Sequence, residues 1–136
     1  MNRPRREIQL TLGVVLTLVL SIALAAQSAQ ELYQRGLVQE HASGDLKRAI
    51  ELYAQAAKAA GKDRALGAKA LVRMGSSQEK LGVEPDAEKT YDELLRVYPE
   101  QRAEVAVAQE RLKALRLERS FFAHFATHTG TVAVGG

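Results

Sequence analysis

The sequence predicts an all-α fold, an α-solenoid of two helical hairpins followed by a closing C-terminal helix, over residues 29–117. Apolar residues recur at helical spacing through almost all of this range. Glycines interrupt the helical pattern at intervals that suit short turns between helices. A set of small and aromatic residues also occurs twice, 38 residues apart: Gly44 and Gly82, Ala49 and Ala87, Tyr53 and Tyr91.

The first hairpin is predicted from about Gln30 to Ala60. Its first helix carries Leu32, Tyr33, Gly36 and Leu37 and ends at the segment "HASGD". Gly44 there is a helix stop, and Asp45 is the N-cap of the second helix. The second helix has its apolar residues on one face: Leu46, Ala49, Ile50, Tyr53, Ala57 and Ala60.

The second hairpin is predicted from Asp63 to Pro99. Asp63 caps a helix that runs to about Leu81, and Gly82 ends that helix. Pro85 then suits the first turn of the next helix, where a missing N–H costs little, and Pro99 stops the helix. The buried stripe of this last helix is predicted to be Ala87, Tyr91, Leu94, Leu95 and Tyr98.

A fifth helix is predicted from about Gln101, with one narrow apolar seam of Val105, Ala108, Leu112 and Leu115. One hairpin cannot bury its own apolar faces, so hairpins of this kind stack and need a polar cap at the end. Gly36 and Gly75, opposite Ala49 and Ala87, allow the two helices of each hairpin to approach closely. We expect the tyrosine four residues after each alanine to fill the space beside that contact.

The second hairpin resembles a tetratricopeptide repeat. Its residues at the spacing of that family are Leu71, Gly75, Ala87, Tyr91, Leu94 and Pro99. Gln78 departs from the pattern, because an aromatic residue is usual there. The first hairpin fits more loosely, since the interval from Gly36 to Ala49 is one residue too long. We therefore expect an insertion in the turn at "HASGD".

The resemblance implies a function as well as a fold. In this family the first helix of each hairpin lines a concave groove that holds a protein or peptide partner. Carried over, the groove positions are Tyr33, Leu37, Glu40 and His41 in the first hairpin, and Lys69, Val72, Arg73, Ser76 and Glu79 in the second. Ordinary solvated helix faces would explain these residues equally well. The predicted function is non-catalytic protein–protein interaction or scaffolding, without a cofactor.

The N-terminus predicts export. Residues 1–25 resemble a secretory signal peptide, because three arginines precede an uncharged apolar stretch and an Ala-x-Ala site at Ala23–Ala25. The alternative is an uncleaved anchor, in which residues 8–26 attach the chain to a membrane. Either reading places the domain in the periplasm or cell envelope. Without residues 1–25, 16 Lys and Arg face 15 Asp and Glu, so no basic excess indicates nucleic acid.

The C-terminal residues 118–136 are predicted to form a flexible tail. Phe121, Phe122 and Phe125 in this tail form either a docking segment for a partner or membrane surface, or a segment that packs back on the fifth helix. His124 and His128 are at helical spacing, which suits a shared metal ion, but a third ligand is not evident. A metal-binding or enzyme-accessory protein is thus one alternative function. A truncated remnant of a longer tetratricopeptide repeat and β-propeller protein is another.

Overall fold

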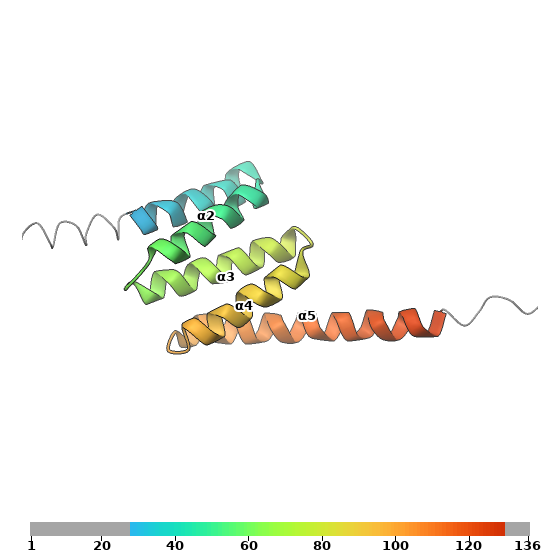
Figure 1. The fold of residues 1–136 in the computed structure, drawn as a ribbon. Coiled ribbons are helices and arrows are strands. Elements are labelled where there is room, and N and C mark those ends of the chain that lie inside the picture. Colours follow the sequence, from blue (N-terminus) through green and yellow to red (C-terminus); the bar gives the residue numbers. More distant parts are fainter. Residues whose placement is uncertain (1–27, 130–136) are drawn as a thin grey trace, which may run out of the picture.

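The computed structural model describes residues 28–129, with the side chains of residues 28–125. The predicted signal segment, the apolar stretch 8–26 and the end of the predicted tail lie outside these residues. The described chain forms five consecutive helices joined by short turns, and it contains no strand (Figure 1). The predicted all-α architecture is confirmed.

The helices stack side by side in chain order, so that each lies next to its sequence neighbour (Figure 1). A first helix over residues 28–38 continues into a π-helical turn, η1 (Gln39–Ser43). The remaining helices are α2 (Leu46–Ala59), α3 (Arg64–Lys80), α4 (Glu84–Val97) and α5 (Arg102–Thr129). Two hairpins result, the first helix with α2 and α3 with α4, and α5 closes the stack.

The predicted helix boundaries rest on side-chain caps and on glycine. An Asp45 carboxylate oxygen accepts the backbone N–H of Arg48 at 3.0 Å, and Asp63 accepts that of Leu66 at 3.0 Å. Gly44 and Gly82 have φ angles of 67° and 77°, a left-handed conformation that costs other residues energy. The two turns that follow the first helix of each hairpin are therefore made in the same way.

The π-helical turn explains the extra residue of the first hairpin. A π-helix closes its hydrogen bonds over five residues instead of four, so it takes in one additional residue without breaking the helix. Residues 39–43 adopt this conformation immediately before Gly44. The predicted insertion is thus present, as a bulge within the helix end.

Glycine–tyrosine contacts hold each hairpin together. A Cβ atom on Gly36 would lie 2.6 Å from a ring carbon of Tyr53, and one on Gly75 would lie 2.6 Å from a ring carbon of Tyr91. Both tyrosines are fully buried. The predicted close approach is confirmed, with each tyrosine ring resting directly on the glycine backbone of the opposite helix.

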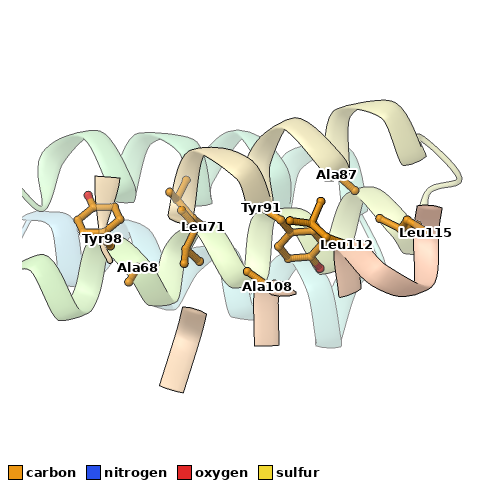
Figure 2. Close-up of a cluster of buried hydrophobic side chains, with 9 residues drawn as sticks. Ala68, Leu71, Ala87, Tyr91, Tyr98, Ala108, Leu112 and Leu115 are labelled. Atoms are coloured by element: carbon orange, nitrogen blue, oxygen red, sulfur yellow. The ribbon is translucent and has the colours of Figure 1, made fainter. Parts of the chain in front are cut away.

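The main core lies between α3, α4 and α5 (Figure 2). The predicted seam of α5 packs there, because Ala108, Leu112 and Leu115 are at most 4% exposed and Val105 is half-buried. On its other side α5 is polar. At the positions 38 residues after Leu71 and Gly75, which face α4 in the second hairpin, α5 carries the exposed side chains of Gln109 and Lys113. The fifth helix therefore has a capping surface.

Helix α5 extends further than the sequence led us to expect. We predicted an end near Leu117 and a tail from residue 118, whereas α5 runs to Thr129 and projects beyond the hairpins (Figure 1). The physical reason is the absence of Gly and Pro between Arg102 and Thr129, so nothing interrupts the helix. Pairs of side chains four residues apart, such as Phe121 and Phe125 with ring centroids 5.4 Å apart, also support it.

Within residues 28–129, no helix combines the length and the apolar character needed to cross a membrane.

Candidate functional site

A groove runs between the first helix of the first hairpin, α3 and α5. At one end it has a volume of about 300 Å³ and an apolar floor flanked by charges. It is lined by Tyr33, Lys69, Val72, Arg73, Ala103, Glu104 and Val107. Four of the predicted groove positions, taken from both hairpins, meet here. The other three lining residues come from α5, which thus forms the second wall.

The groove continues along α3 and α5 into a more polar hollow of about 560 Å³. Ser76 and Glu79, two further predicted positions, line it from α3. The residues opposite them on α5 include Arg111, Ala114 and Glu118. The groove therefore has an apolar end and a mixed-charge end, and one helix face of α5 borders both.

Beyond the hairpins, the same face of α5 becomes aromatic. Glu118, which lines the polar hollow, also lines a third hollow together with Phe121 and Phe122. These two phenylalanines are 60% and 70% exposed, and Phe125 is 56% exposed. Three exposed aromatic side chains on one helical projection are unusual, because large apolar patches on a protein surface commonly mark binding sites.

Glu40 does not offer its carboxylate to a partner. Its side chain is only 1% exposed. One carboxylate oxygen accepts the Tyr53 hydroxyl at 2.7 Å and the other accepts the Lys80 ammonium at 2.6 Å. Arg73 lies 3.9 Å away and His41, itself exposed, lies 3.8 Å away. Glu40 is therefore a structural tie between the first hairpin and α3, rather than an open groove contact.

Glu79 repeats this arrangement in the second hairpin. It accepts the Tyr91 hydroxyl at 2.6 Å and is held by the guanidinium of Arg111 from α5. Each glutamate lies four residues after the glycine of its hairpin, and each accepts the tyrosine that packs on that glycine. Each also receives its cation from the following structural unit. The two ties orient successive helices and so fix the groove walls. Leu37 is half-buried and lines neither the 300 Å³ groove end nor the polar hollow.

The ties shift the titration of their members. Burial alone would raise the pKa of Glu40, but the hydrogen bonds from Lys80 and Tyr53 and the nearby cations outweigh it, so this pKa lies below the usual 4.5. Glu79 behaves alike: hydrogen bonds from Arg111 and Tyr91 overcome the effect of burial and lower its pKa. Burial and the adjacent glutamates raise the pKa of the Tyr53 and Tyr91 hydroxyls. Both ties are therefore ionic at neutral pH.

These shifts predict acid sensitivity. A carboxylate with a lowered pKa in the folded state stabilises the fold above its unfolded pKa, near 4.5, and loses this contribution as pH falls through the folded value. We expect Glu40→Gln to cost about 1–3 kcal/mol at pH 7, since Lys80 loses its ionic acceptor, and to flatten the dependence of stability on pH. Urea unfolding at pH 7 and at pH 3 measures both effects.

Glu51→Gln is the matched control for this experiment. Glu51 is exposed and pairs with Arg48 alone among the described residues, an interaction worth about 0–1 kcal/mol. The same loss of stability and the same pH dependence in both variants would contradict the assignment of Glu40 as a tie.

The contribution of α5 to the groove escaped the sequence reading, which assigned this helix only a capping role. Val107, Arg111, Ala114 and Glu118 lie 38 residues after Lys69, Arg73, Ser76 and Lys80. This is the interval that relates α2 to α4, and it also relates the start of α3 to that of α5. Extending the 38-residue repeat to the fifth helix would have identified its groove face. The cap and the groove wall are different faces of one helix.

The predicted histidine pair has no structural support in the described region. His124 lies on the exposed end of α5 and lines the hollow beside Phe121, and the side chain of His128 lies outside the described residues. Among the described side chains, no group of three or more His, Cys, Asp or Glu residues is arranged to hold a metal ion. The metal-binding alternative stays a prediction from sequence.

Comparison with known proteins identifies the second hairpin. Residues 69–100 match the family model of the tetratricopeptide repeat. This range contains most of α3, all of α4 and Pro99. No curated protein and no solved structure matches the chain. The match and the five-helix stack agree on a helical-repeat architecture.

Proposed function

We propose that this chain is a non-catalytic protein–protein interaction module whose groove binds a helical segment of a partner protein. Tetratricopeptide repeats usually bind protein partners, and residues 69–100 match such a repeat. The observation that carries the proposal is the convergence of Tyr33, Lys69, Val72 and Arg73 from two hairpins on one groove opposite Val107.

The groove suits an amphipathic helix as its ligand. Val107 and Glu118 are eleven residues apart on α5, so the two hollows together extend for about 16 Å, or three helical turns. Helix-in-groove recognition places apolar side chains of the ligand at intervals of three or four residues. Val72, Val107 and the ring of Tyr33 would receive such side chains, whereas Lys69 and Glu104 would orient them.

A photo-cross-linking residue placed at Val107 tests the groove. We expect irradiation of cells that produce this variant to yield a defined protein adduct, since the Val107 side chain is 41% exposed inside the groove. Adding Lys69→Glu should lower the yield several-fold. The cross-linker at Lys47, an exposed residue of α2, is the control. Equal adducts from both positions would rule out the groove as the binding site.

We further propose that the module works in the cell envelope. The support is the basic start of the chain, the uncharged stretch 8–26 and the Ala-x-Ala site within residues 1–25. If this segment is retained, residues 8–26 would attach the module to a membrane. Cell fractionation and mass spectrometry of the recovered chain check this proposal, and an intact chain in the cytoplasmic fraction would contradict it.

A further inference from the structure

The groove face of α5 has a pattern that is complementary to itself. Along this face, in chain order, lie apolar Val107, basic Arg111, small Ala114, acidic Glu118 and aromatic Phe122. Their intervals of four, three, four and four residues keep them on one side of a helix. The first four line the groove, and Glu118 connects it to the hollow at Phe121 and Phe122. The face is therefore continuous from the groove to the projecting end.

Two copies of this face match when they run antiparallel about a two-fold axis between positions 114 and 115. Arg111 lies three residues before position 114, and Glu118 lies three residues after position 115. Each arginine would then face the glutamate of the other copy. Val107 and Phe122 are likewise seven residues from the axis, so an apolar residue would face an aromatic one. Ala114 at the centre would let the two helices approach closely.

The charged residues have capacity for this pairing. Glu118 is exposed and makes no ion pair with a described residue. Arg111 uses its Nε and one terminal nitrogen for Glu79, and its side chain is 48% exposed. A guanidinium carries five N–H donors, so Arg111 can hold a second carboxylate without releasing the first.

The exposed aromatic area is also substantial. Phe121, Phe122 and Phe125 are 60%, 70% and 56% exposed, which at about 200 Å² for each side chain leaves roughly 300–400 Å² of aromatic surface. Standard interfaces bury about 800 Å² per partner. The projecting end together with the groove floor, where Val107 is 41% exposed, approaches this size.

We propose that the groove is occupied by a second copy of this chain, with the projecting end of each α5 lying antiparallel along the groove face of the other. The interface is isologous, since the same stripe serves both copies. This inference rests on the proposed helix-binding function of the groove and names its occupant. The charge complementarity between Arg111 and Glu118 sets the register, and the phenylalanines provide most of the buried area.

Sedimentation analysis of the purified full chain over a range of concentrations tests the pairing. We expect a reversible dimer whose dissociation constant increases about tenfold or more with Phe122→Ser or Glu118→Arg, because each removes a central contact. Leu117→Ser and Glu110→Arg are the controls. They make the same kinds of change at exposed residues outside the stripe and should leave the dissociation constant within about twofold.

An introduced cysteine reports the register. The chain contains no cysteine, so Ala114→Cys would place a single thiol beside the two-fold axis, within reach of its symmetry mate. We expect oxidation to give a covalent dimer from this variant, and none from Gln109→Cys on the capping face.

The outcomes separate this inference from the proposed function. A chain that is monomeric at every concentration, or a dimer that Phe122→Ser and Glu118→Arg leave unchanged, overturns the pairing. In that case an adduct at Val107 that contains a different protein would still support the groove as a binding site. An adduct with twice the mass of the chain agrees with the pairing.

Discussion

A chain cut after Pro99 is expected to lose its cooperative unfolding transition. The cut removes α5, whose Leu112 and Leu115 are almost fully buried against α3 and α4. Burying one leucine is worth about 1.5–3 kcal/mol, and small domains are stable by only about 5–15 kcal/mol. Loss of both leucines, of Ala108 and of the cation that holds Glu79 would remove much of that margin. Thermal unfolding followed by circular dichroism measures the result.

A chain cut after Glu118 is the control. It keeps the whole seam of α5, the contact of Arg111 with Glu79 and the bidentate contact of Arg116 with Asp92 at 3.2 Å. Among the described ion pairs it loses only that of Arg119 with Glu88, which is partly exposed and worth about 0–1 kcal/mol. We expect this chain to unfold cooperatively. A cooperative transition in the chain that ends at Pro99 would show that α5 is not needed to close the core.

Replacement of Tyr91 by alanine is expected to destabilise the fold by about 3–5 kcal/mol, the usual cost of removing a buried aromatic ring. The ring is fully buried and rests on Gly75, and its hydroxyl donates to Glu79. The variant would therefore leave a cavity between α3 and α4 and take one donor away from a carboxylate held by Arg111. Urea unfolding at neutral pH measures the loss.

Two companion variants divide this effect. Tyr91→Phe keeps the ring and removes only the hydroxyl, so it should cost about 0.5–1.5 kcal/mol. Tyr33→Ala removes a tyrosine that is only half-buried, in the groove, and should cost clearly less than Tyr91→Ala. A loss in Tyr91→Ala no larger than that in Tyr33→Ala would refute the role of the glycine–tyrosine contact.

Most of the fold could be predicted because its determinants are local in sequence. Asp45 and Asp63 act as caps, Gly44 and Gly82 as left-handed stops, and the intervals of Gly, Ala and Tyr define the hairpins. The end of α5 was wrongly placed because residues 118–129 lack both a stop signal and a periodic apolar stripe. Polar composition was read as a tail, although nothing in it breaks a helix.

The candidate site was predicted only in part, because burial depends on which helices come together. Glu40 and Glu79 occupy groove positions by spacing, but their carboxylates are taken up by Lys80 and Arg111, 40 and 32 residues further along the chain. Contacts over such intervals are invisible to local pattern analysis. The groove wall on α5 was missed for a related reason, since its residues share the 38-residue interval but not the residue types of α3.

The two carboxylate ties also bear on how such a chain grows in evolution. Each hairpin carries a glutamate whose cation is encoded in the next unit, Lys80 for Glu40 and Arg111 for Glu79. Gene duplication of a whole unit would copy the glutamate of one junction together with the cation of the preceding one, so every new junction would be complete at birth. The residue 38 positions after Glu79 is Leu117, and α5 therefore carries no carboxylate at this position that would require a successor. Ancestral arrays of different length can thus share one kind of final helix.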